Sequence, residues 1–188
     1  MLVLGDRHRR LASEAGRTTE ELITIAPCPV LVVAENRASS PAGTSPRAVV
    51  VGVDDAPGAL QVLLRALRVA EELGEPVEVV RAVGEVGYGA EGIARREQDE
   101  IETSPVEALV ATAKDKVPGV PVEVVVAEDR PARLLLERSA GAALVVVGHR
   151  GHTAGELVGV GSTTLSLLLA APCPVLVLGP ALTTSGER

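Results

Sequence analysis

Glycine and hydroxyl side chains with the spacing of a ligand-binding loop lie near the C-terminal end of the chain. The spaced glycines are Gly148, Gly151 and Gly161, and Ser162 and Thr163 follow the last of them. Because glycine has no Cβ, the backbone can turn tightly and a ligand can approach it closely. A helix that begins at this point would offer free N–H groups and a partial positive charge to a phosphate. The pattern therefore indicates a phosphate-binding loop, and the alternative is an ordinary strand-to-helix loop with Ser162 as N-cap.

A strand must precede this loop and a helix must follow it. The five apolar residues 143–147 predict the strand, and the Leu-rich residues 162–170 predict the helix. The same reading of the upstream sequence predicts helices in which Asp54 and Asp129 are candidate N-caps. Strands that alternate with helices predict a parallel sheet with helices on both faces. The further predicted strands are 48–53, 77–83, 122–127 and 174–178, and the further predicted helices are about 57–73, 105–117 and 130–140.

The glycine loop resembles the nucleotide-binding signature of the universal stress protein family, in which Gly-x-x-Gly is followed after nine residues by Gly-Ser. The neighbouring motifs agree with that family: residues 144–148 before the loop, residues 171–177 after it, and residues 49–54 far upstream. The resemblance covers roughly residues 47–179. It implies an open, doubly wound α/β sheet of the adenine-nucleotide α-hydrolase type, with strand order 3-2-1-4-5.

The resemblance also implies where a nucleotide would bind. In such sheets, ligands bind at the carboxyl ends of the strands where the strand order reverses, which would bring Asp54 beside Gly148. Asp54 resembles the family acid near the ribose and adenine, although an N-cap role is open for it as well. The residues that the resemblance assigns to the nucleotide are Val53, Asp54, Ala82, Gly148, His149, Arg150, Gly151, Gly161, Ser162 and Thr163.

The sequence departs from the family pattern close to this site. Asp55-Ala56 stands where the family often has Gly-Ser, and His149 replaces a common Ser. Residues 128–131 lack a glycine that is often found there. Asp55 adds negative charge near an anionic ligand, so it would weaken binding or require Mg²⁺.

Residues 1–36 look like a second, degenerate copy of the C-terminal end of the chain. The heptapeptide APCPVLV occurs at residues 26–32 and again at residues 171–177. Such an internal repeat is a strong organisational signal. We therefore divide the chain into a partial repeat (1–36), a linker rich in Ser, Pro, Gly and Ala (37–46), a complete universal stress protein domain (47–180) and a tail (181–188).

The first copy has lost the residues that would bind a phosphate. His8 stands where the second glycine is expected, and Gly16 is followed by Arg17 and not by Ser. We expect no nucleotide at this end, and we predict strand 2–4, helix 17–25 and strand 30–33 as a docking element. In the family, last strands commonly pair antiparallel, so residues 27–33 should lie against residues 172–178 of the same or a neighbouring chain.

The composition restricts the partners. The net charge is −7 and no Lys/Arg-rich block occurs, which argues against nucleic acid. No apolar run reaches 18 residues, and the first residues lack the order of a signal peptide, so we expect a cytoplasmic protein and no membrane span. Cys28 and Cys173 suggest no disulfide framework, and the scattered Cys and His residues favour no zinc site or other metal centre.

Three functions compete. The first is a stress-response or signalling module that binds ATP, with or without Mg²⁺, and does not turn it over rapidly. The second is a slow ATP-hydrolysing enzyme, for which we identify no catalytic residue: His149, Arg150 and His152 are the candidate bases, and they fit a site-lining role better. The third is a nucleotide-free scaffold that forms homodimers through its last strand.

Overall fold

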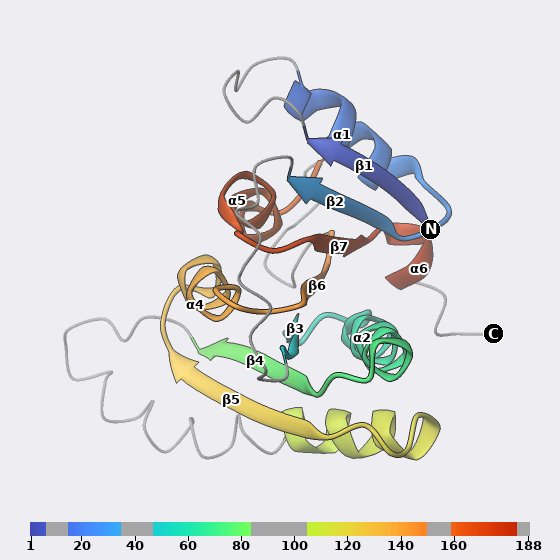
Figure 1. Ribbon diagram of the computed structural model, residues 1–188, viewed down its shortest axis with the longest axis vertical. Coiled ribbons are helices and arrows are strands. Elements are labelled where there is room, and N and C mark those ends of the chain that lie inside the picture. Colours follow the sequence, from blue (N-terminus) through green and yellow to red (C-terminus); the bar gives the residue numbers. More distant parts are fainter. Residues whose placement is uncertain (7–14, 35–46, 84–104, 150–158, 184–188) are drawn as a thin grey trace.

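Seven strands form one sheet in the computed structural model, which describes residues 1–6, 15–34, 47–83, 105–149 and 159–183. The strand order is β1-β2-β7-β6-β3-β4-β5, and Figure 1 shows the strands stacked from β1 at the top to β5 at the bottom. The strands are β1 (Leu2–Asp6), β2 (Val30–Ala34), β3 (Val49–Gly52), β4 (Val77–Val83), β5 (Val122–Glu128), β6 (Leu144–Gly148) and β7 (Val175–Leu178).

Helices connect the strands and cover the sheet. A helix over residues 105–116 precedes β5 in the chain. The labelled helices are α1 (Ala15–Ile25), α2 (Ala59–Leu73), α4 (Pro131–Arg138), α5 (Ser162–Ala170) and α6 (Pro180–Thr183).

The strand order predicted for the universal stress protein domain is confirmed. Strands β3 to β7 follow one another in the chain and lie in the sheet as β5-β4-β3-β6-β7, which is the order 3-2-1-4-5. Every neighbouring pair among these five strands is parallel. Valine-rich strands suit this arrangement because a parallel sheet is buried on both faces.

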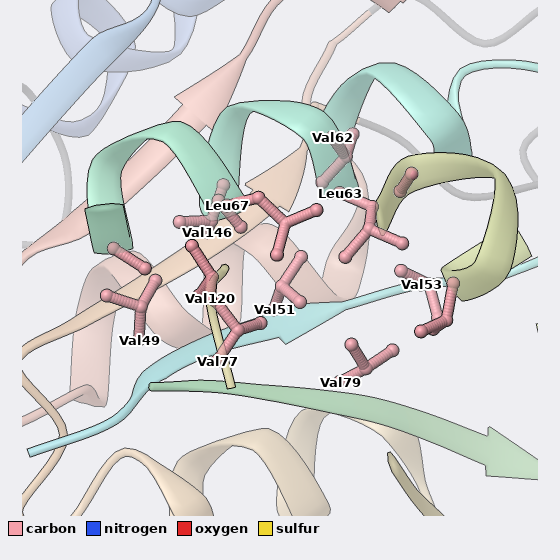
Figure 2. Close-up of a cluster of buried hydrophobic side chains, with 14 of the residues drawn as sticks. Val49, Val51, Val53, Val62, Leu63, Leu67, Val77, Val79, Val120 and Val146 are labelled. Atoms are coloured by element: carbon pink, nitrogen blue, oxygen red, sulfur yellow. The ribbon is translucent and has the colours of Figure 1, made fainter. Parts of the chain in front are cut away.

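Alternation along the strands separates the core into two clusters. In β3, Val49 and Val51 belong to one cluster and Val50 to the other, as expected because successive side chains of a strand point to opposite faces. The first cluster also contains residues of α2 and of the helix over residues 105–116, and Figure 2 shows Leu63 and Leu67 of α2 packed with these valines. The second cluster contains residues of α1, α4 and α5.

The N-terminal segment forms the predicted strand, helix and strand, and it extends the same sheet. Strand β2 pairs antiparallel with β7, with Val30 opposite Val177 and Val32 opposite Val175. The predicted contact between residues 27–33 and 172–178 is therefore present within one chain. Because β6 lies on the other side of β7, both edges of the last strand are paired.

One expectation about a helix boundary is wrong. Asp129 does not cap α4: the N-cap is Arg130, and the Asp129 carboxylate accepts a hydrogen bond from the Arg130 N–H (2.7 Å). The predicted tail is partly folded, since α6 follows β7 directly and Leu182 packs against the first core cluster. Proline at its first position fixes φ in a helical range.

Candidate functional site

The candidate site lies at the carboxyl ends of β3 and β6, where the sheet changes its direction of winding. These two strands are parallel neighbours, with Val51 opposite Val146. After β3 the chain enters α2, whose buried residues lie in the first core cluster, and after β6 it reaches α5, whose buried residues lie in the second. Connections that leave on opposite faces open a crevice between the two strand ends.

The two ends of the glycine loop are hydrogen-bonded to each other. The Gly161 N–H donates to the carbonyl of His149 (2.8 Å), and the His149 N–H donates to the carbonyl of Leu178 in β7 (2.8 Å). The Thr164 hydroxyl donates to the carbonyl of Gly148 (2.8 Å). The last bond joins the first turn of α5 to the end of β6, so the loop ends are fixed although they are distant in sequence.

Thr164 was not predicted as a site residue. It is 3% exposed and lies in the first turn of α5. A buried hydroxyl needs a hydrogen-bond partner, and the carbonyl of Gly148 provides it. The sequence signal for Thr164 was a polar residue that follows the predicted phosphate-contacting residues, on a helix whose other buried residues are apolar.

The N-cap of α5 is not the residue that the sequence suggested. Gly161, in an extended conformation, is the N-cap, and no side chain caps the helix. The alternative that made Ser162 the N-cap is therefore wrong, since Ser162 is the first residue of the helix. Ser162 is exposed and Thr163 is half-buried, and both belong to the first turn of α5.

Asp54 follows β3 and is part of a tight turn. Its Oδ1 accepts a hydrogen bond from the Ala56 N–H (3.0 Å), as Asp side chains do in turns. The alternative that made Asp54 the N-cap of α2 is wrong, because that N-cap is Gly58. Val53, which precedes Asp54, is buried and its N–H donates to the carbonyl of Val80 (3.0 Å).

The neighbouring strand β4 brings two more residues to this edge of the sheet. Ala82, which the family resemblance assigns to the site, is half-buried near the end of β4. Arg81, which precedes it, was not predicted: its Nη2 lies 2.6 Å from Oδ2 of Asp55. A charged residue in the apolar sequence of β4 was the available signal, because a buried charge requires a partner.

Two predicted site residues, Arg150 and Gly151, lie outside the described residues, as does the candidate base His152. In the first copy, His8 and the side chain of Arg17 also lie outside them. The structure shows where the other site residues lie, and their roles toward a nucleotide stay predictions. What the structure does establish is that the carboxyl ends of β3, β4 and β6 adjoin one another.

Two further features of the described residues bear on other possible sites. Among them, no group of three His, Cys, Asp or Glu residues could hold a metal ion. Burial raises the pKa of Glu78, against the opposing effect of Arg138, whose Nη1 is 3.5 Å from Oε1 of Glu78. Glu78 pairs with Val50 and lies away from the carboxyl ends of the strands, so we interpret it as structural.

Comparison with known proteins identifies the family. The model of the universal stress protein family matches residues 46–179. The chain belongs to the universal stress protein family. The match includes every residue assigned to the candidate site from the sequence.

Curated universal stress proteins of Mycobacterium tuberculosis are similar to this chain. Rv2028c is 36% identical over 137 residues, which cover 72% of this chain and 49% of that protein. Rv2005c is 35% identical over 187 residues, which cover 94% of this chain and 61% of that protein. This universal stress protein thus spans about half to three fifths of the length of these relatives.

Solved structures support the fold. A universal stress protein from Archaeoglobus fulgidus DSM 4304 has a TM-score of 0.56 at 18% identity, covering 94% of this chain and 59% of that chain. A universal stress protein solved in complex with cAMP has a TM-score of 0.53 at 22% identity, covering 70% of this chain and 96% of that chain. Within the described part of the present chain, no helix is both long and apolar enough to cross a bilayer.

Proposed function

We propose that this universal stress protein binds an adenine nucleotide, ATP, at the carboxyl ends of β3 and β6. The observation that carries the proposal is the joining of the glycine-loop ends beside Asp54. Gly161 is bonded to His149, and β6 neighbours the strand that ends before Asp54. The complex of a related universal stress protein with cAMP agrees with an adenine ligand.

The arrangement suits binding better than rapid turnover. The N-terminal N–H groups of α5 and the hydroxyls of Ser162 and Thr163 are suited to phosphate oxygens. The turn to Ala56 holds the Asp54 carboxylate just beyond β3, and we propose that it accepts a hydrogen bond from a ribose hydroxyl. We therefore propose a stress-response or signalling module in the cytoplasm that retains its nucleotide, with slow hydrolysis as the less favoured alternative.

Calorimetric titration with ATP, with and without Mg²⁺, tests the proposal. We expect one nucleotide per chain, because residues 1–36 lack the glycines and Ser of the loop. In Gly151→Val a branched side chain should occupy the space of the phosphate and abolish measurable binding. Gly5→Val is the matched control, since nothing lies within 4 Å of the position its Cβ would take. Unchanged affinity of Gly151→Val would contradict the proposal.

Asp54→Ala separates a ligand role from a structural one. We expect its nucleotide affinity to fall at least tenfold, because a charge-assisted hydrogen bond contributes roughly 1.5–3 kcal/mol. Loss of the turn bond to Ala56 should lower the free energy of unfolding by only about 1 kcal/mol. Melting curves recorded beside the titrations compare the two effects, and a loss of stability with intact affinity would assign Asp54 to the fold alone.

A nucleotide-free scaffold is the second candidate. The pairing of β2 with β7 within one chain supports a structural role of residues 1–36, and it covers the strand edge through which a homodimer would form. That pairing places residues 1–36 as a structural extension of the sheet. A homodimer through the last strand would require β2 of one chain to pair with β7 of another. Deleting residues 1–36 and measuring sedimentation tests this: a monomer that becomes a dimer would show that the free edge of β7 pairs between chains, and an unchanged, equally stable monomer would show that the segment is dispensable.

A further inference from the structure

One carboxylate lies on a covered face of the sheet, away from the candidate site. Glu78 of β4 lies opposite Val50 of β3, on the face that α4 covers, and its side chain is 17% exposed. Oε1 of Glu78 is buried, and no donor among the described residues forms a hydrogen bond with it. Such a carboxylate is costly to keep ionised, because nothing replaces the water that it has lost.

Two charged groups face Glu78 from the elements beside it. Glu123 of β5 pairs with Glu78 in the parallel register, so two carboxylates are neighbours across the strands. Arg138, in the last turn of α4, has its Nη1 3.5 Å from Oε1 of Glu78, and its side chain is 39% exposed. On the remaining side, β3 contributes the apolar Val50. Glu78 is therefore repelled by Glu123 and attracted by a cation that water partly screens.

Helix α4 packs closely on the sheet around this cluster. Leu134 and Leu135 are buried in the second core cluster together with Val50. A Cβ added to Gly52 of β3 would lie 2.9 Å from Cδ1 of Leu135, which shows how near the helix approaches the strand. Because α4 has only 8 residues, a charge beneath its last turn acts on a large part of its contact with the sheet.

We propose that Glu78, Glu123 and Arg138 form a pH-sensitive contact that holds α4 more tightly on the sheet in mildly acidic solution than at neutral pH. The inference does not rest on the proposed function. Its physical basis is the charge of Glu78. The protonated side chain is neutral, is no longer repelled by Glu123 and is cheaper to bury, whereas the ionised side chain depends on the attraction of Arg138 alone.

The sign of the pH dependence follows from the direction in which the pKa of Glu78 is shifted. Burial raises this pKa above its ordinary value of 4.5, Arg138 opposes the increase, and Glu123 adds to it. The folded state therefore binds this proton more strongly than the unfolded chain does. The stability that neutral Glu78 contributes is fully present below pH 4.5 and is lost as the pH rises through the raised pKa.

The test compares the wild type with Glu78→Gln, whose amide has nearly the shape of the protonated carboxyl group and no charge at any pH. The difference between their midpoints of urea denaturation should be smallest at pH 4.5 and should grow toward neutral pH, with Glu78→Gln the more stable. Hydrogen exchange locates the effect. The Leu134 and Ser139 N–H groups donate backbone hydrogen bonds in the first and last turns of α4, and their protection should fall toward neutral pH in the wild type relative to Glu78→Gln.

The two charged neighbours should shift the effect in opposite directions. Glu123→Gln removes the repulsion, so it should raise the midpoint at neutral pH and have a smaller effect when Glu78→Gln is also present. Arg138→Gln removes the attraction, so it should lower the midpoint more at neutral pH than at pH 4.5. Glu123 is exposed, so Glu123→Gln is expected to fold and decides the question if Glu78→Gln does not. Glu137→Gln is the matched control, because Glu137 is an exposed residue of the same helix, and it should keep the wild-type pH dependence.

Four results would overturn the inference. Glu78→Gln that is less stable than the wild type at neutral pH would show that ionised Glu78 and Arg138 stabilise the fold as an ion pair. A difference in midpoint that is the same at every pH would show that Glu78 does not change its charge over this range. A midpoint that depends on pH without any change in the protection of α4 would place the effect outside this contact. An equal effect in Glu137→Gln would assign it to the net charge of the protein.

Discussion

The two strand–helix–strand units of this universal stress protein, β1-α1-β2 and β6-α5-β7, share their sheet geometry and differ in their loops. Leu2 pairs with Val30 in the first unit as Val145 pairs with Val175 in the second, at equivalent positions of the two motifs. The Leu2 N–H donates to the carbonyl of Pro29 (2.9 Å), and the Val145 N–H donates to that of Pro174 (3.0 Å).

The helices of the two units end in the same way as well. The Ala26 N–H donates to the carbonyl of Leu22, and the Ala171 N–H donates to that of Leu167, each at 2.8 Å. The loop sequences, in contrast, share few residues, and Gly16, the counterpart of Gly161, is the second residue of α1 and not an N-cap. The comparison teaches that the apolar strands and the Pro-Cys-Pro turn suffice for this packing, whereas the Gly-Ser loop is needed only where a ligand is proposed. That the first unit arose as a repeat stays a prediction.

The largest effect is expected from removing the main buried contact of the first unit. Ile23 of α1 is fully buried in the second core cluster, so Ile23→Ala should lower the free energy of unfolding by about 2–5 kcal/mol. Nucleotide affinity should stay unchanged, because the change lies in the unit without the loop. Chemical denaturation and calorimetry measure the two quantities.

Ile25→Ala is the control for Ile23→Ala. It lies on the same helix but is 73% exposed, so it should change the free energy of unfolding by less than about 0.5 kcal/mol. Equal stability of Ile23→Ala and Ile25→Ala would show that α1 does not pack on the sheet as the structure describes.

An intermediate effect is expected where the two units meet. A Cβ added to Gly179, directly after β7, would lie 2.6 Å from the carbonyl oxygen of Ile23, and a backbone atom can move away only if the helix shifts. Gly179→Ala should therefore lower the free energy of unfolding by about 1–3 kcal/mol. Gly5→Ala, with open space around its Cβ, should change it by less than about 0.5 kcal/mol. Thermal melts that rank the two variants the other way would contradict this contact.

The smallest effect on stability is expected at the loop of the second unit. Thr164→Val removes the hydroxyl that donates to Gly148 and keeps the shape of the side chain. The free energy of unfolding should fall by about 1 kcal/mol, and nucleotide affinity should fall with it, because the loop ends are no longer joined at this point.

Thr19→Val is the matching change in the first unit, since Thr19 precedes Ala26 by the same interval as Thr164 precedes Ala171. We expect nucleotide affinity to be unaffected in Thr19→Val. Affinity that falls equally in both variants would erase the functional difference between the two units.

The sequence by itself determined the local elements and the family of this protein. Runs of Val and Leu with helices between them predicted a parallel sheet, because strand and helix periodicities are local properties of the chain. The glycine spacing marked the second loop, and the doubled heptapeptide marked the first unit and its contact with β7. The helix ends were less well predicted, since Asp54, Asp129 and Ser162 all looked like caps and none of them is one.

Only the tertiary structure decided which distant groups meet. The pairing of Arg81 with Asp55, the hydrogen bond from Gly161 to His149, and the close approach of Gly179 to Ile23 depend on strand register and helix placement. No local pattern encodes such contacts, because a register shift of one residue would turn Arg81 to the opposite face of the sheet. The sequence thus marked the glycine loop and Asp54 as candidates, and the fold decided that Asp55 pairs with Arg81.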